Sequence, residues 1–172
     1  MVALAALLFA ITARAQDIPA ADASFGYSFL FVAKGYTLSM NGGSSTVALN
    51  LNRWLGVVGD LGIYDGSPGI PRLIGETYTF GPRFSFRKWT RLTPFAQAVI
   101  GGAHANSTNG GFLGANNAFV YGGGGGGGLG LDRAGRVALR AQMEFLGFHT
   151  KPSETGTVRV SAGIVVRFGR RY

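Results

Sequence analysis

The chain of 172 residues lacks cysteine, is poor in charged residues and contains no long uninterrupted apolar segment. The absence of cysteine excludes disulfides, thiolate metal sites and cysteine nucleophiles. Charged residues make up only 14% of the chain, whereas a soluble domain carries roughly a quarter. Hydrophobic residues make up 47%, yet no segment reaches the roughly 18 apolar residues that a membrane-spanning helix needs. Such a chain forms either a soluble all-β core or a membrane β-barrel with alternating apolar residues.

The apolar residues that are present alternate with small or charged ones. Between Val158 and Phe168 every second side chain is apolar, and the intervening positions include Arg159 and Arg167. A strand sends successive side chains to opposite faces, so this segment has one apolar and one polar face. The same pattern indicates strands at 24–32, 45–51, 54–64, 76–87, 118–131, 136–147 and 158–168, and a short strand at 94–103 whose facing the pattern leaves ambiguous. The sequence predicts an all-β fold, an antiparallel up-and-down transmembrane β-barrel of about eight strands.

The connections between the predicted strands alternate in length. Short ones lie at 52–53, 88–93 and 132–135, and they require antiparallel neighbours. Outer-membrane barrels have short periplasmic turns and longer external loops. We therefore assign the long connections to the external side, where they are candidate sites for an extracellular ligand. These long connections are 33–44, 65–75, 104–117 and 148–156.

Two of the predicted strands contain residues that strands disfavour. Pro82 cannot donate a ladder hydrogen bond, which predicts a bulge or a missing bond at that position. Seven consecutive glycines, Gly122 to Gly128, are more typical of a flexible linker. Because Tyr121 and Leu129 flank the glycines in matching phase, we favour a strand that makes room inside a narrow barrel. A flexible break remains the alternative.

The first residues have the pattern of a secretion signal. Val2 to Thr12 is an apolar run, and Ala13 and Ala15 are small residues at the two positions that a signal peptidase reads. No Lys or Arg precedes the run, so a disordered apolar terminus is the alternative. We predict a signal peptide at 1–15 and an outer-membrane barrel domain at 16–172.

Four blocks of sequence resemble one known family. They read NRWLGVVGD at 52–60, YTFGPRFSFR at 78–87, TPFA at 93–96 and GIVVRFG at 163–169. These blocks look like the small OmpA-like outer-membrane β-barrel proteins of acidobacterial type. The resemblance implies the outer membrane of a Gram-negative cell, with outer-membrane lipids and the barrel assembly machinery as partners. We expect a structural or interactive role in the cell envelope, with a narrow porin-like channel for small solutes as the alternative.

The polarity of the barrel separates two classes of protein. A soluble lipocalin-like barrel has an apolar interior, whereas a membrane barrel turns its apolar face to lipid. The polar face of this chain consists mainly of Gly, Ser, Thr and Ala, and charged residues are too few to cover a soluble surface. Both features favour the membrane barrel. Aromatic residues near the predicted strand ends would form its interfacial girdle: Tyr27, Trp54, Trp89, Phe168 and Tyr172.

With the apolar face outward, charged residues point into the lumen. We expect a lumen charge cluster of Asp60, Arg83, Arg140, Glu144 and Arg159, in which the carboxylates pair with the three arginines. The reason is that a charge in a narrow interior needs a partner or water. The cluster serves either an anion-preferring pore or a plug of ion pairs that fills a small barrel. We favour the plug.

A second set of charges lies at the predicted periplasmic turns, in a chain whose net charge is +8. This basic rim would contact lipid phosphates of the inner leaflet or a periplasmic polyanion. The alternative, which we favour, is that these basic residues are solvated side chains of ordinary turns. Nucleic acid is not expected as a partner, because the chain has no basic helix or recognition motif. The members of the rim are Arg53, Arg87, Lys88, Arg91, Arg133, Arg170 and Arg171.

The only histidines, His104 and His149, lie at predicted external strand ends. Ser153 and Glu154 follow His149, so a lipid A-modifying enzyme is a third interpretation. A hydrolase needs a nucleophile within reach of a base that a third group orients, and the chain has no acyl-transfer signature. Two distant histidines also make a poor metal site. We predict no catalytic activity, no metal site and no cofactor.

Overall fold

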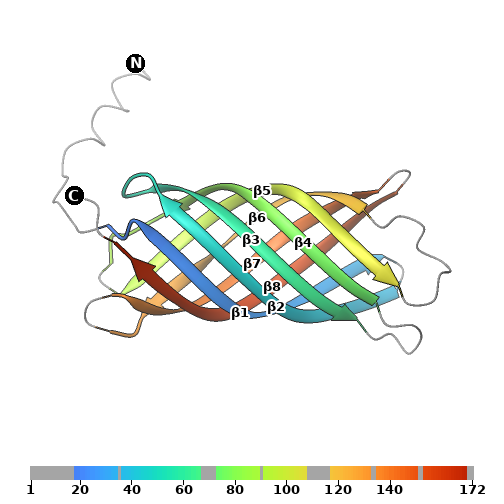
Figure 1. The fold of residues 1–172 in the computed structure, drawn as a ribbon, viewed down its shortest axis with the longest axis horizontal. Helices are drawn as coiled ribbons and strands as arrows, with labels where there is room; N and C mark the ends of the chain where they lie inside the picture. The colour runs from blue at the N-terminus through green and yellow to red at the C-terminus, as the bar shows by residue number, and fades with distance from the viewer. Residues whose placement is uncertain are drawn as a thin grey trace, which may run out of the picture.

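Eight antiparallel strands close into one barrel in the computed structural model, which describes residues 18–34, 36–66, 73–89, 91–107, 117–132, 135–150 and 153–169. Each strand pairs with its neighbours in sequence, and β8 pairs with β1 to complete the ring (Figure 1). This confirms the predicted fold class. The strands are β1 (Ala21–Lys34), β2 (Tyr36–Asn50), β3 (Leu55–Gly66), β4 (Leu73–Ser85), β5 (Leu92–Ser107), β6 (Asn117–Gly130), β7 (Val137–Thr150) and β8 (Ser153–Phe168). The predicted signal peptide lies outside the described residues.

The barrel has two different ends, which Figure 1 shows at its left and right. We call the left end the turn end, where β2 passes to β3, β4 to β5, and β6 to β7. The start of β1 and the end of β8 also lie there, with Ala21 paired to Phe168. The opposite end, where β1, β3, β5 and β7 finish, is the loop end.

Side-chain oxygens build two of the connections at the turn end. Asn52 Oδ1 accepts hydrogen bonds from the backbone N–H groups of Trp54 and Leu55, at 2.9 and 2.7 Å. Asp132 Oδ1 accepts one from the Val137 backbone N–H at 3.0 Å. That backbone hydrogen bond lowers the pKa of Asp132 below its usual value. Asn and Asp favour turns because their side chains hydrogen-bond nearby backbone in this way.

Two of the four predicted external loops lie largely within strands, so these two predictions are wrong. Residues 36–44 of the expected 33–44 loop belong to β2, and most of 148–156 belongs to β7 and β8. Gly42 pairs with both Ser28 and Tyr64, so the glycine lies inside the sheet. Backbone ladders need no side chain, and turn-like composition was therefore a misleading signal here. In the other two predicted loops the strands reach Gly66 and Ser107, while 67–72 and 108–116 lie outside the described residues.

The glycine run is a strand, as predicted. Gly122–Gly128 lie in β6 and pair with β5 on one side and β7 on the other. At Pro82 the ladder between β4 and β5 is interrupted, but no extra residue forms a bulge. Among the described pairs of β4 and β5, none involves Gly81 or Pro82, and the ladder resumes at Arg83 in the same register.

The exterior of the barrel is apolar and its interior is mostly polar. Phe25 and Leu61 point outward with 67% and 60% of their surfaces exposed, whereas Asp60 and Arg83 point inward with 2% and 1%. The predicted girdle residues Tyr27, Trp54, Trp89 and Phe168 are all exposed, and Tyr172 lies outside the described residues. Within the described ranges, no helix is long and apolar enough to cross a membrane.

Candidate functional site in the barrel lumen

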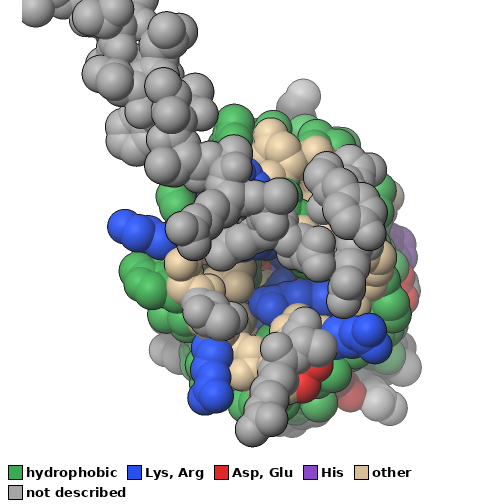
Figure 2. All heavy atoms as spheres, turned by 90° about the vertical axis from the view of Figure 1, so that its left-hand side faces the viewer, with side chains coloured by type: hydrophobic (Ala, Val, Ile, Leu, Met, Phe, Trp, Pro, Cys, Tyr) green, Lys and Arg blue, Asp and Glu red, His purple; other side chains and the backbone are tan. Residues whose placement is uncertain are grey.

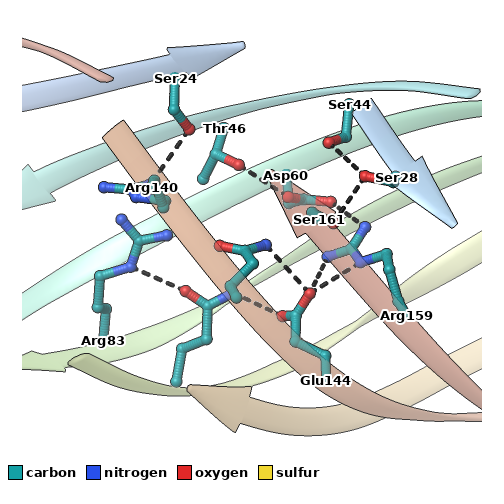
Figure 3. A network of polar contacts seen from close by, with 12 residues as sticks. Ser24, Ser28, Ser44, Thr46, Asp60, Arg83, Arg140, Glu144, Arg159 and Ser161 are labelled. Atoms are coloured by element: carbon teal, nitrogen blue, oxygen red, sulfur yellow. Dashed lines mark hydrogen bonds and ion pairs between the residues drawn. The ribbon is translucent and has the colours of Figure 1, made fainter. Parts of the chain in front are cut away.

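An ion-pair network of Asp60, Glu144 and Arg159 crosses the middle of the lumen (Figure 3). The three residues come from β3, β7 and β8, and each is at most 2% exposed. Arg159 donates from Nη1 to Asp60 Oδ1 at 2.6 Å, and from Nε and Nη2 to Glu144 Oε2, the Nε contact at 2.8 Å. One guanidinium therefore joins two carboxylates on different strands, with two of its N–H groups converging on a single oxygen of Glu144.

Neutral side chains satisfy the remaining oxygens of this network. Thr46 donates to Asp60 Oδ2 at 2.8 Å, and Arg159 Nη1 also donates to the Tyr64 hydroxyl at 3.0 Å. Gln97 and Gln142 donate to Glu144 Oε1 and Oε2 at 2.7 and 3.3 Å. Buried charges need this degree of hydrogen bonding to remain ionised inside a protein.

Arg83 and Arg140 also point into the lumen, but the expected pairing with carboxylates is wrong for both. Arg83 Nε donates to Gln97 Oε1 at 2.8 Å, and Arg140 Nη1 donates to Ser24 Oγ at 3.1 Å. Both guanidinium groups instead lie against the Phe95 ring, at 4.7 and 5.0 Å from its centroid. The carboxylate oxygens of the central network are already occupied by Arg159 and the glutamines, which leaves these two arginines without an acidic partner there.

On the loop-end side of the ion pairs the lumen is filled by apolar side chains. Leu30, Met40 and Tyr64 pack together, and Phe148 lies against them. A second cluster of buried apolar side chains extends from the turn-end parts of β2 and β3 toward the loop end: Ala48, Val58, Val99, Ala103, Val120 and Leu146. Met40 could not be placed from the sequence, because it falls in the segment that was predicted to be a loop.

On the turn-end side the lumen is rich in positive charge. Asp22 lies 3.8 Å from both Arg87 and Arg167, and it is the only buried carboxylate among the described residues of this half. Arg87 also donates to Asn50 Oδ1 at 2.8 Å. Burial lowers the pKa of Arg87 from its usual value, although Asp22 opposes the shift. Figure 2, which faces this end, shows Lys and Arg side chains both inside the mouth and around it.

The predicted basic rim is represented at the turn end by a few exposed residues. Arg53, Lys88 and Arg91 are exposed, whereas Arg87 is partly buried and donates to the Arg53 carbonyl at 3.0 Å. Arg133, Arg170 and Arg171 lie outside the described residues. The described part of the rim thus divides into three exposed cations and one that belongs to the lumen mouth.

The two histidines lie near the loop end, on β5 and β7. His104 Nδ1 is 2.9 Å from Asn117 Oδ1, and His149 Nδ1 is 3.1 Å from Glu154 Oε1. Glu154 and His149 are both exposed. The described ranges hold no group of three His, Asp or Glu side chains that could bind a metal ion.

Solved structures share this fold, although their sequences differ widely. Neisserial surface protein A superposes with a TM-score of 0.69 at 14% identity, covering 87% of this chain and 97% of that one. OprG from Pseudomonas aeruginosa gives 0.66 at 7%, covering 89% and 97%. Ail of Yersinia pestis, solved with the heparin analogue sucrose octasulfate, gives 0.63 at 18%, covering 86% and 97%. No family model and no curated protein sequence matches the chain. The chain has the fold of small eight-stranded outer-membrane barrels.

Proposed function

We propose that this protein is an outer-membrane barrel with a structural and interactive role in the cell envelope, and that its lumen is closed. The observation that supports closure is the filled interior. Arg159 joins Asp60 to Glu144 across the lumen, and Leu30 and Met40 pack on the loop-end side. A barrel of about eight strands has an interior that side chains can fill completely.

The apolar exterior supports the membrane location. Outward residues such as Phe25, Leu61 and Phe80 are each more than half exposed, and they recur around the ring. An apolar surface that extends far beyond a few hundred Å² marks contact with a membrane or another protein. Outer-membrane lipids and the barrel assembly machinery are the partners that such a barrel would need. An extracellular ligand would bind at the loop end.

Two measurements test this proposal in sequence. The chain refolded in detergent micelles should run faster on a gel without boiling than after boiling, and should give a β-type circular dichroism spectrum. It should then insert into planar bilayers without producing conductance steps. A chain that folds and stays soluble without detergent would overturn the membrane location, and a lipocalin-like carrier would replace it.

A narrow small-solute channel is the second candidate, and one observation favours it. The turn-end half of the lumen holds Arg83, Arg87, Arg140 and Arg167 against one buried carboxylate, Asp22. A cationic lumen favours passage of anions. This alternative requires conductance steps that change when Glu144→Gln alters the central network, while the exposed Glu76→Gln leaves them unchanged. A protein that never conducts rejects the channel.

A lipid A-modifying enzyme is the least supported role. Its only support is the contact between His149 and Glu154 near the loop end. Replacing His104 or His149 by alanine should leave every envelope phenotype intact. Loss of an acyl-chain modification in either variant, with the barrel still folded, would restore the enzyme hypothesis.

A further inference from the structure

The turn-end half of the lumen contains a buried cation, Arg83, most of whose N–H donors have no hydrogen-bond partner among the described residues. Arg83 is 1% exposed, and only its Nε has a partner, Gln97 Oε1. Nη1 and Nη2 of Arg83 are buried and meet no acceptor in the part of the chain that the structure describes. Guanidinium carries five N–H donors, and buried polar groups without a partner are rare in folded proteins. We therefore expect a hydrogen-bond acceptor beside the Nη groups of Arg83.

A second cation lies beside Arg83. Arg140 Nε is likewise buried without a hydrogen-bond partner among the described residues, and its Nη1 reaches only the neutral Ser24 hydroxyl. Both guanidinium carbons lie within 5.0 Å of the centroid of the same Phe95 ring, and Figure 3 shows the two groups on the same side of the network. The ring face attracts cations, but it accepts none of their in-plane N–H groups.

The two central carboxylates are already engaged. Glu144 receives Arg159, Gln97 and Gln142, while Asp60 receives Arg159 and Thr46. Asp22 lies 3.8 Å from both Arg87 and Arg167, and its Oδ1 accepts no hydrogen bond from any described residue. This one carboxylate therefore faces four arginines and pairs with neither Arg83 nor Arg140, and like charges in a low-dielectric interior repel each other strongly.

Space for a small ligand exists next to Arg140. A cavity of about 20 Å³ is lined by polar side chains together with wall residues. A cavity above roughly 10–15 Å³ holds a particle the size of one water molecule. Such a space is large enough for a monatomic ion, and Arg140 is the arginine that lines it. Its polar lining consists of Ser24, Ser44, Thr46, Arg140, Gln142 and Ser161.

We propose that Arg83 and Arg140 bind a monovalent halide ion, chloride under ordinary conditions, in the turn-end half of the lumen. The ion accepts the N–H groups that the protein leaves unused and reduces the repulsion between the two guanidinium groups. Hydroxyl groups such as that of Ser24 complete its surroundings. The site is separate from the central ion pairs and requires neither conductance nor catalysis.

Thermal unfolding at matched ionic strength tests the site. The fraction of the compact gel band should be followed with temperature in sodium chloride, sodium bromide, sodium gluconate and sodium sulfate. Chloride and bromide should raise the midpoint along a saturating curve, by roughly 3–6 °C at ten times the dissociation constant. Gluconate should not, and sulfate, which stabilises folded proteins by exclusion from their surface, should give no saturating rise. Arg83→Met should abolish the halide effect, and Lys88→Gln, which removes an exposed turn-end cation, should retain it.

Crystals of the wild-type protein grown in bromide provide a second measurement that does not depend on the variant folding. An anomalous bromine peak within hydrogen-bond distance of Arg83 and Arg140 nitrogens is the expected result. Equal midpoints in all four salts, or a bromide crystal with no peak beside these arginines, would overturn the proposal and assign the unused donors to water. A midpoint that rises equally with every salt would overturn it as well, because that result reports charge screening.

Discussion

Gln97 donates a 2.7 Å hydrogen bond to Glu144 across the glycine strand β6. Gly124 is the β6 residue between them, since it pairs with Gln97 on β5 and with Glu144 on β7. A Cβ built at Gly124 would lie 2.8 Å from Glu144 Cγ and 2.1 Å from the Met143 carbonyl oxygen. Two long side chains can therefore meet over this strand because it carries no side chain of its own.

The Gly124→Ala variant should be less stable than the wild type. Its methyl group would collide with the β7 backbone, and overpacking of this kind costs about 1–3 kcal/mol. The measurement is the unfolding midpoint in urea with the protein refolded in lipid vesicles. Gly59→Ala is the matched control, because a Cβ there meets nothing within 4 Å. Equal stability of the two variants would contradict this account of the glycine strand.

Arg159→Met should destabilise the barrel far more than Glu144→Gln. Removing Arg159 leaves two buried carboxylates without a cation, and breaking a buried ion pair costs about 3–5 kcal/mol. In Glu144→Gln, Asp60 still pairs with Arg159. The same urea titration measures both variants, with the exposed Arg91→Met as control. A triple variant that combines Arg159→Met with Asp60→Asn and Glu144→Gln should recover part of the loss; a further loss in the triple would reject the charge argument.

Asp132 should make stability depend on pH. Its carboxylate has a lowered pKa in the fold, because the Val137 backbone N–H donates to it. Its contribution is thus fully present above the unfolded pKa of about 3.9 and is lost as the pH falls through the lower folded-state pKa. The difference in unfolding midpoint between wild type and Asp132→Ala should shrink between neutral and acidic pH. Asp132→Asn keeps the acceptor but does not titrate, so its smaller difference from the wild type should shrink over the same pH range; a wild-type advantage that grows in acid is the contrary outcome.

The two tryptophans should report contact with lipid. Trp54 and Trp89 lie at the turn end with 51% and 56% of their surfaces exposed, and the chain has no others. Aromatic side chains at this level form the interfacial girdle of membrane barrels. Brominated phospholipids should quench their fluorescence, more strongly when the bromine is near the headgroup than near the chain end. Trp54→Phe and Trp89→Phe separate the two signals. Quenching by aqueous iodide alone would place both residues in water.

Alternation along the strands predicted which residues face inward but could not predict how they pair. Asp60, Glu144 and Arg159 all fall on the polar face of clean strands, and their inward position follows from a period of two. The ion pairs between them depend on distances across the lumen, and the alternation of residues in a sequence gives no information on those distances. Gln97 was missed because the facing of 94–103 was ambiguous, and it turned out to link Arg83 to Glu144.

Composition was a weaker guide than alternation. The Gly-Gly-Ser segment at 42–44 suggested a loop, yet it lies in β2 opposite Gly26 and Ser28. The glycine run at 122–128 also suggested a loop by its composition. There the flanking residues Tyr121 and Leu129 lie in the same phase of a two-residue period, and this correctly indicated a strand. In a narrow barrel, glycine at a sheet position allows neighbouring strands and long side chains to approach, so it does not mark a chain reversal.

The partners of Arg159 lie far from it in the chain: Asp60 is 99 residues earlier and Glu144 is 15 residues earlier. Asp60 and Glu144 therefore obtain their shared cation only when β8 lies in place between β7 and β1. Until that strand docks, moving the two carboxylates out of water is costly. Closing the seam between β8 and β1 and pairing these carboxylates are thus the same step. A barrel that assembles from the complete chain has an electrostatic reason to stay open and hydrated until β8 has docked.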